Sequence, residues 1–198
     1  MLKQLYPIIA EHIYAFKQIL VDKRASLNEK TEQWFTLNRG TSHPEVFSKC
    51  KIVCPQRSKT NTFGYNECEW YAASDVFFLT NPKEGYDLKY LLGLLNSKLY
   101  FMWLYSKGKR KGETLELTAT PLSEIPIKKC GDREMASIVL LVDSIISAKK
   151  QGKYTSALEN QIDFLVYHLY GLTYDEVLIV DPETPISRDE YESYNIEQ

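Results

Sequence analysis

The stretch of sequence that decides the fold begins with Lys51-Ile52-Val53-Cys54-Pro55-Gln56-Arg57-Ser58 and belongs to a segment that runs from residue 49 to residue 128. Ile52 and Val53 indicate a β-strand, and Pro55 should end its pairing because proline has no amide hydrogen to donate to a neighbouring strand. Residues 69–80 are rich in aromatic and β-branched side chains, which favours a second strand or a bent pair of strands. Together these runs predict a small sheet.

A helix with apolar residues nearly all round is predicted after these strands. Asp87 is a suitable N-cap for a helix over residues 88–106, because its carboxylate can accept the free amide hydrogens of a first turn. Apolar side chains recur at helical spacing through the segment: Leu88, Tyr90, Leu91, Leu92, Leu94, Leu95, Leu99, Phe101, Met102 and Trp103. A helix that is apolar on most sides is buried, so this one is predicted to be the core helix, pressed against the sheet.

The segment before the sheet predicts one amphipathic helix and a short extended run. Residues 7–24 carry one apolar stripe, formed by Ile9, Ile13, Phe16 and Leu20, and Pro7 suits the first turn. Residues 34–37 are interpreted as a short strand. Trp34 is expected to be a buried anchor, because an exposed indole leaves a large apolar area in water. Contact of Trp34 or Arg39 with a nucleic acid is the alternative.

The segment after the sheet predicts helices and an acidic tail. Residues 133–149 and 154–169 are amphipathic, and the short break between them indicates an antiparallel helical hairpin that ends at Gly171. Thr173 and Glu176 have the spacing of a capping box that opens a short last helix. His168 is interpreted as a structural histidine. Residues 181–198 contain six acidic residues and one basic residue, and beyond Pro182 we expect a loosely ordered chain.

Composition excludes several classes of protein but selects none. The chain has 198 residues, 44% of them hydrophobic, which is enough for a sizeable core. It contains no apolar run of about 18 residues and no basic-then-apolar leader, so we expect a cytoplasmic protein without a membrane span. Cys50, Cys54, Cys68 and Cys130 form no Cys-x-x-Cys pair, which argues against a disulfide framework and a zinc site. No metal ligand is predicted.

Positive charge is concentrated in two connections. Residues 46–66 contain no acidic residue, and four basic ones: Lys49, Lys51, Arg57 and Lys59. The second connection is Lys107-Gly108-Lys109-Arg110-Lys111-Gly112, with four positive charges in six residues. Glycine permits close backbone approach to a phosphate. Cations at the end of a helix are also favoured by the helix dipole, which would explain one or two of these charges without a ligand.

The residue types in the two connections suit DNA. Gln56, Arg57 and Asn61 are candidates for base reading, because arginine can make two hydrogen bonds to guanine and an amide can make two to adenine. Candidates for phosphate contact, which fixes register without reading sequence, are Ser58, Lys59, Lys107, Lys109, Arg110 and Lys111. The alternative is a pair of solvated surface loops without a ligand.

An ordered series of motifs carries a family resemblance. Residues 51–58 are followed by Asn61-Thr62-Phe63, by residues 70–79, by Leu94-Leu95-Asn96-Ser97-Lys98-Leu99 and by Ile125-Pro126-Ile127. In that order and spacing the series resembles the TaqI-like C-terminal specificity domain of type II and type IIG restriction-modification DNA adenine methyltransferases. Residues 7–24 resemble the entry helix of that family, and residues 161–171 resemble its exit helix.

From the patterns and the resemblance we expect an α+β fold: a small twisted mixed sheet with a buried core helix, flanked by an N-terminal helix and a C-terminal helical hairpin. The expected divisions are a DNA target-recognition domain at residues 1–130, a helical annex at 131–180 and an acidic tail at 181–198. Within the first division, the entry helix is expected at residues 7–24 and the sheet with its core helix at 49–128.

The resemblance implies a function without catalysis in this chain. The chain would read double-stranded DNA and position a target adenine for an N6-methyltransferase domain outside it, in an enzyme that cleaves DNA in some members. S-adenosylmethionine would belong to that other domain, so no cofactor is expected here. Asn81-Pro82 is followed by Lys83 and Glu84, so it lacks the aromatic residue that clamps a flipped adenine in the methyltransferase tetrapeptide.

Three alternatives stay open at this level. The first is the recognition domain of a phage-defence methyltransferase without a nuclease. The second is a protein-interaction domain whose helical hairpin docks a partner and whose basic loops have no role with DNA. The third is a complete small enzyme, although no serine, histidine and acid set has a spacing that suggests one.

Overall fold

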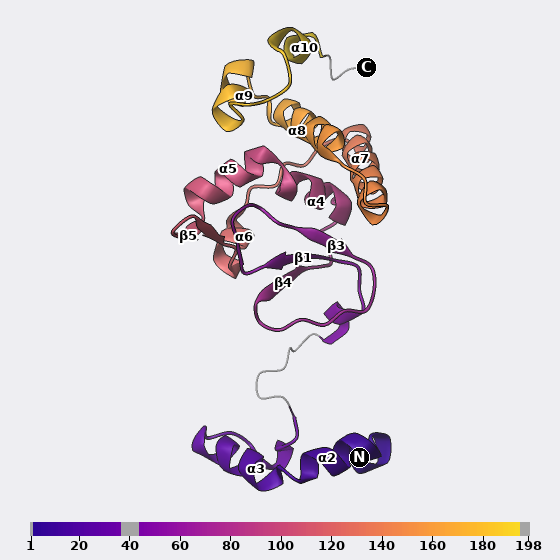
Figure 1. Cartoon of the computed structure of the whole chain (residues 1–198), viewed down its shortest axis with the longest axis vertical. Helices are drawn as coiled ribbons and strands as arrows, with labels where there is room; N and C mark the ends of the chain where they lie inside the picture. Colours follow the sequence, from indigo (N-terminus) through magenta and orange to yellow (C-terminus); the bar gives the residue numbers. More distant parts are fainter. Residues whose placement is uncertain (1, 37–43, 195–198) are drawn as a thin grey trace. The chain divides into compact units, whose positions relative to one another are not determined.

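The computed structural model describes residues 2–36 and 44–194 of the chain. It divides into two compact units, Met1–Pro44 and Glu45–Gln198. Among the described residues, ten α-helices accompany two antiparallel three-stranded sheets, which confirms the predicted α+β class (Figure 1). The boundaries predicted at residues 130 and 180 both lie inside the second unit.

The first unit is helical. Its elements are α1 (Leu2–Leu5), α2 (Pro7–Tyr14), α3 (Lys17–Ser26) and the 3₁₀ turn η1 (Thr31–Gln33). The single helix predicted over residues 7–24 is therefore interrupted, at residues 15 and 16. Trp34 is 8% exposed, which confirms the predicted anchor, and its ring meets that of Tyr14 edge-on with centroids 5.0 Å apart. The predicted strand is wrong for residues 34–36, which form a turn, and Leu37 and Arg39 lie outside the described residues.

The second unit contains a first three-stranded sheet, in which the strand order is β3-β1-β4. After the 3₁₀ turn η2 (Pro44–Phe47), its strands are β1 (Lys51–Pro55), β3 (Gly64–Asn66) and β4 (Val76–Leu79). The strand predicted over residues 69–80 starts only at Val76, because residues 69–75 form an irregular loop in which Trp70 and Tyr71 are exposed. The strand predicted from aromatic content was therefore too long.

A second sheet contains β2 (Arg57–Ser58), β6 (Thr114–Glu116) and β5 (Lys109–Lys111), in the order β2-β6-β5. Gln56 is the link between the two sheets. Its amide donates to the carbonyl oxygen of Asp75 at 2.7 Å, and its own carbonyl accepts from the amide of Leu117 at 2.8 Å. The one mixed sheet that we expected is thus two antiparallel sheets. The prediction that Pro55 ends the pairing of its strand is wrong, because Pro55 lies opposite Val76 of β4 and the amide of Gln56 continues the bonding beyond it.

The predicted core helix is two helices, α4 (Leu88–Asn96) and α5 (Lys98–Lys107), separated by Ser97. The Asp87 cap is confirmed, since its carboxylate accepts from the amides of Lys89 and Tyr90. Ser97 is the N-cap of α5 and its hydroxyl also donates to the carbonyl oxygen of Leu94 at 2.7 Å. Both helices are deeply packed: Tyr90 and Leu94 are fully buried, and Leu104 is 1% exposed.

The helical hairpin covers the face of α4 that is turned away from the first sheet (Figure 1). It follows α6 (Ala119–Glu124) and consists of α7 (Asp132–Lys150) and α8 (Ser156–Tyr170), which confirms the prediction. The α8 helix ends at Gly171 with a φ of +69°, as the sequence predicts. A methyl group added at Gly93 of α4 would lie 2.7 Å from Ile138 of α7, so glycine allows the two helices to pack closely.

The acidic tail is more ordered than we expected. After α9 (Tyr174–Val180), which has the predicted capping box, the chain forms α10 (Arg188–Ser193). Tyr191 of α10 is 3% exposed and its ring stacks on His168 with centroids 4.0 Å apart. His168 is structural in this setting, although its Nε2 has no hydrogen-bond partner among the described residues. The expectation of a loosely ordered segment is therefore wrong for residues 188–193, because Tyr191 buries an aromatic ring.

Candidate nucleic-acid interface

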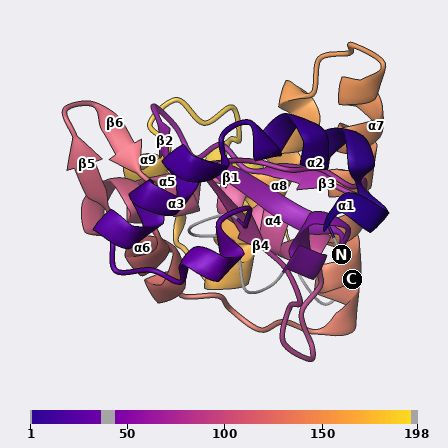
Figure 2. The same ribbon diagram turned by 90° about the horizontal axis from the view of Figure 1, so that it is seen from below.

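The two basic connections meet in the second sheet. Its central strand β6 pairs with β2 on one side and with β5 on the other, so Glu116 lies directly opposite both Arg57 and Lys109. Figure 2 shows β5 and β6 projecting as a hairpin at the left edge of the view. Segments that are about 50 residues apart in the chain are thereby neighbours in one sheet.

One face of this sheet collects most of the positive charge. Residues directly opposite each other in antiparallel strands share a face, and side chains alternate along a strand. Arg57, Lys109 and Lys111 therefore lie on the face of Glu116. Leu115 points the other way and is 1% exposed, which joins the sheet to the hydrophobic core. The core contact on one face leaves the basic face turned outward.

Glu116 is the acidic centre of this basic face. Its Oε1 lies 3.4 Å from the guanidinium of Arg57, and its Oε2 lies 3.2 Å from the ammonium of Lys109. The carboxylate side chain is 10% exposed, whereas those of Arg57 and Lys109 are 53% and 73% exposed. The hydrogen bond from Lys109, together with the charges of Lys109, Arg57 and Lys111, lowers the pKa of Glu116. Arg57 and Lys109 therefore shield the carboxylate from solvent, while their own side chains remain exposed to solvent.

The remaining predicted cations do not all share this face. Arg110 is opposite Leu115, and its guanidinium lies 4.1 Å from the ring centroid of Tyr105 in a cation–π contact. Lys107 is exposed in the last turn of α5, where the helix dipole favours a cation. Lys59 is exposed in the turn after β2. The four charges of the second connection are thus divided between two sides of the hairpin and the helix end.

Two glycines shape the hairpin that carries these cations. Gly108 ends α5, and a methyl group added there would collide with the carbonyl oxygen of Leu104. Gly112 and Glu113 connect Lys111 to Thr114 as a two-residue loop. Gly112 has a φ of +62°, which suits the first central position of a type II′ turn. The glycines that the sequence suggested for phosphate approach have these conformational roles in the structure.

Asn61 is bonded inside the domain. Its Nδ2 donates to the carbonyl oxygens of Leu95 and Ser97, both at 2.8 Å, so a two-bond contact with adenine would require this amide group to leave the core. Ser58 and Thr62 share a hydrogen bond of 2.8 Å between their hydroxyl groups. The side chain of Gln56 has no hydrogen-bond partner in the described part of the chain and is partly exposed. Of the three base-reading candidates, Gln56 and Arg57 have side chains available to a ligand.

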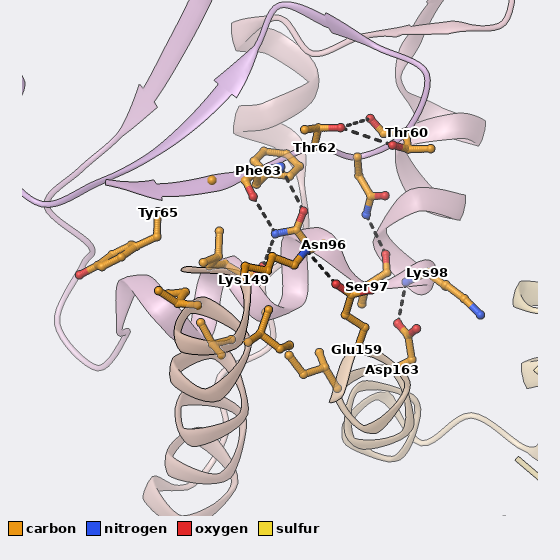
Figure 3. Close-up of a pocket in the computed structure, with 18 of the residues that line it drawn as sticks. Thr60, Thr62, Phe63, Tyr65, Asn96, Ser97, Lys98, Lys149, Glu159 and Asp163 are labelled. Atoms are coloured by element: carbon orange, nitrogen blue, oxygen red, sulfur yellow. Dashed lines mark hydrogen bonds and ion pairs between the residues drawn. The ribbon is translucent and has the colours of Figure 1, made fainter. Parts of the chain in front are cut away.

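Asn96 is an anchoring residue, a role that the sequence analysis did not assign to it. Its Oδ1 accepts from the amide of Phe63 at 3.0 Å, and its Nδ2 donates to the carbonyl oxygen of Phe63 at 3.0 Å (Figure 3). The next residue but one, Lys98, donates its amide to Asp163 of α8 at 2.8 Å. The Leu-Leu-Asn-Ser-Lys-Leu motif therefore holds the connection after β2 to the core. A polar residue at the end of an apolar helix was the available signal.

A cavity of about 530 Å³ lies beside this anchor, between residues 60–65, the α4–α5 junction and the helical hairpin (Figure 3). Its floor is apolar, with Leu92, Val142 and Ile162. Its rim includes the ion pair between Lys149 and Glu159, at 2.9 Å. Thr60, whose hydroxyl also suits phosphate, lines this cavity, but none of the cations predicted to contact phosphate does. The cavity and the basic face are therefore different surfaces.

Lys51 does not contribute to the basic surface. It is fully buried, and its ammonium group donates to the carbonyl oxygens of Phe47, Lys49 and Cys68 at 2.9, 2.7 and 3.0 Å. Three carbonyl groups match the three hydrogens of an ammonium, which compensates its burial. The charge that the sequence counted in this connection therefore overstated the positive surface by one cation.

Comparison with protein families identifies the family of the chain. The chain belongs to the TaqI-like C-terminal specificity domain family, whose model matches residues 7–127. This finding confirms the resemblance expected from the motifs. No helix in residues 2–36 or 44–194 is long and apolar enough to cross a membrane.

The individual proteins to which this chain is similar include three type II methyltransferases. M.MjaIV from Methanocaldococcus jannaschii is 28% identical over 166 residues, which cover 83% of this chain and 55% of that protein. M.HindII from Haemophilus influenzae is 28% identical over 163 residues, which cover 78% of this chain and 30% of that protein. M.HincII, also from Haemophilus influenzae, is equally similar. The matched part is thus about half of the first relative and less than a third of the second.

Proposed function

We propose that this chain is the DNA-recognition module of a type II restriction-modification enzyme. In this proposal it reads double-stranded DNA and positions a target adenine for an N6-methyltransferase domain that lies outside the chain. S-adenosylmethionine would be bound by that other domain, as the methyl donor. The family of the chain and the names of its relatives support this class.

The observation that carries the proposal is the meeting of Arg57 with Lys109 and Lys111 on one outward face. Phosphate contacts supply affinity and register, and an arginine beside them can read a base edge in the major groove. Three cations against one carboxylate leave this face positively charged. We assign base reading to Gln56 and Arg57, and phosphate contact to Lys109 and Lys111 on this face. The other proposed phosphate contacts lie beside it, with Arg110 on the opposite side of the hairpin and Lys107 at the end of α5; they are Ser58, Lys59, Lys107 and Arg110. Asn61 reads a base only if DNA releases its core hydrogen bonds.

A salt titration of duplex binding tests this function. The logarithm of the affinity for a 20-base-pair duplex should fall linearly with the logarithm of the salt concentration, because bound cations release counterions from DNA. The triple variant Arg57→Gln, Lys109→Gln, Lys111→Gln should have a slope that is shallower by about 1 to 3, at about 0.9 per lost phosphate contact. The lower figure applies if Glu116 keeps Arg57 and Lys109 from phosphate in the natural chain.

The matched control replaces three exposed lysines at the end of the helical hairpin, Lys149→Gln, Lys150→Gln and Lys153→Gln. This control variant loses the same number of charges, and its salt slope should equal that of the natural chain. Equal losses in both triple variants would mean that only net charge matters and would reject the assigned face. Absence of duplex binding by the natural chain would reject the proposed function, and binding of a protein partner with no salt dependence would favour the interaction-domain alternative.

A further inference from the structure

A carboxylate on the central strand of the proposed DNA-binding sheet needs an explanation. Glu116 would repel the phosphates that Arg57 and Lys109 attract, yet it lies directly opposite both. Stability alone does not explain it, because ion pairs contribute little when their cations are in water, and both partners here are more than half exposed. A neutral polar residue would keep the strand without the repulsion.

The carboxylate of Glu116 binds two cations in the way that a phosphate group would. One carboxylate oxygen faces Arg57 and the other faces Lys109, at 3.4 and 3.2 Å, so a single anionic group holds both cations. A phosphate must therefore compete with Glu116 for them. A base edge need not, because a guanidinium has five donor hydrogens in a planar fork and can contact guanine while one side stays on the carboxylate.

We propose that Glu116 determines specificity in this domain. It competes with phosphate for Arg57 and Lys109, and it orients the guanidinium of Arg57 for a base edge. Non-specific binding is weakened, while the specific contact is kept. This inference rests on the proposed DNA-reading function, since it concerns the same face. Glu116 is a positioning residue, because it acts through Arg57 and Lys109.

The charge state of Glu116 supports this role at neutral pH. The hydrogen bond from Lys109 and the charges of Lys109, Arg57 and Lys111 hold its pKa below the ordinary value of a glutamate. The carboxylate is therefore ionised wherever DNA binding is normally measured. The carboxylate of Glu116 can therefore compete with phosphate for the two cations at any pH used for such measurements.

The test compares Glu116→Gln with Glu113→Gln in the full chain. Glu113 belongs to the same hairpin and its replacement changes the charge equally, but it is exposed at the turn and has no ion pair with Arg57 or Lys109. On a duplex of random sequence, Glu116→Gln should bind more tightly and with a salt slope steeper by about 1 to 2, because two cations become available to phosphate. Glu113→Gln should show a smaller gain and an unchanged slope.

A second readout measures specificity directly. After selection from a pool of random duplexes, the natural chain and Glu113→Gln should enrich the same sequence, and Glu116→Gln should enrich it several-fold less. In a Lys109→Gln background, Glu116→Gln should steepen the slope by only about 1, since one of the two released cations is missing. A merely structural role of Glu116 would lower the melting temperature without steepening the salt slope.

The outcomes separate the two proposals. If the natural chain binds duplex DNA with a steep salt slope and the two glutamine variants behave alike, the role of Glu116 is rejected and the DNA function stands. Weaker binding by folded Glu116→Gln also rejects the role. If the natural chain binds no duplex, the function and this inference are rejected together.

Discussion

At the scale of single residues, Asn96 is the anchor on which the position of the connection after β2 depends. Its side chain satisfies both the amide and the carbonyl group of Phe63, and Phe63 is 7% exposed. Asn96→Ala removes both hydrogen bonds, so we expect it to lower the free energy of unfolding by about 1 to 3 kcal/mol, at about 0.5 to 1.5 kcal/mol per bond. Urea denaturation followed by circular dichroism measures this change.

The control for that prediction is Asn160→Ala. Asn160 lies on the rim of the same cavity, and its side chain forms no hydrogen bond with any residue that the structure describes. Its replacement should change the free energy of unfolding by less than about 0.5 kcal/mol. Similar effects of the two substitutions would show that the bonds to Phe63 do not stabilise the domain.

Asp163 should make stability depend on pH. Burial, with smaller contributions from Asp181 and Glu159, raises its pKa from 3.8 to about 6, against the opposing hydrogen bond from Lys98. The folded state then holds this proton more tightly than the unfolded state. The contribution of Asp163 to stability is complete below about pH 4 and is lost as the pH rises to about 6.

The corresponding variant is Asp163→Asn. The free energy of unfolding of the natural chain, relative to that of the variant, should fall by roughly 2 to 3 kcal/mol between pH 4 and pH 6, because one pKa unit corresponds to about 1.4 kcal/mol. Urea denaturation of both proteins at several pH values gives this difference. A difference that stays constant across the range would contradict the raised pKa.

The same scale shows what the sequence could and could not reveal. Asp87 and the Thr173–Glu176 box were predictable, because caps depend on neighbours a few residues away. The buried ammonium of Lys51 and the bonds from Asn61 to Leu95 and Ser97 join residues that are distant in the chain. Residue type alone made all of these polar groups look like surface groups. Glu116 was missed for the same reason, since its partners are set by strand register.

At the scale of elements, the β5–β6 hairpin depends on two glycines for different reasons. A methyl group at Gly108 collides with the backbone of Leu104, whereas one at Gly112 meets nothing within 4 Å and suffers only from the positive φ. Gly112→Ala should therefore cost about 1 to 2 kcal/mol in the free energy of unfolding. Gly108→Ala should cost more, because the hairpin must move relative to α5.

Chemical denaturation and duplex binding of the two glycine variants give the comparison. Gly108→Ala should also weaken duplex binding several-fold under conditions where it is folded, because displacement of β5 separates Lys109 from Arg57. Gly112→Ala should bind nearly as tightly as the natural chain. If Gly112→Ala lowers both the free energy of unfolding and the duplex affinity more than Gly108→Ala does, the close contact of Gly108 with Leu104 does not determine the position of the hairpin.

Apolar periodicity predicted the helices well and the strands poorly. It found the hairpin of α7 and α8, because a helix buries one stripe whatever lies opposite. It did not show the break at Ser97, where a cap between two apolar helices leaves the pattern almost unchanged. It extended β4 back through residues 69–75, since exposed aromatic residues such as Trp70 look the same in sequence as buried ones.

At the scale of the whole molecule, two segments that are distant in the chain form one surface through β6. The sequence identified both basic connections and predicted DNA as their ligand. It could not show that β2 and β5 are joined by β6, because sheet order depends on the complete packing of the domain. The structure also showed that the cations are divided, with Arg57, Lys109 and Lys111 on one face and Arg110 on the other.

The most direct measurement is a titration of the ¹⁵N-labelled chain with a DNA duplex, followed by nuclear magnetic resonance. If the two basic segments form one DNA-binding face, the amide signals of residues 56–59 and 109–116 should shift together with the same apparent affinity, while those of the α7–α8 hairpin stay in place. Shifts confined to the helical hairpin, or to only one of the two basic segments, would contradict the claim that these segments form one DNA-binding face.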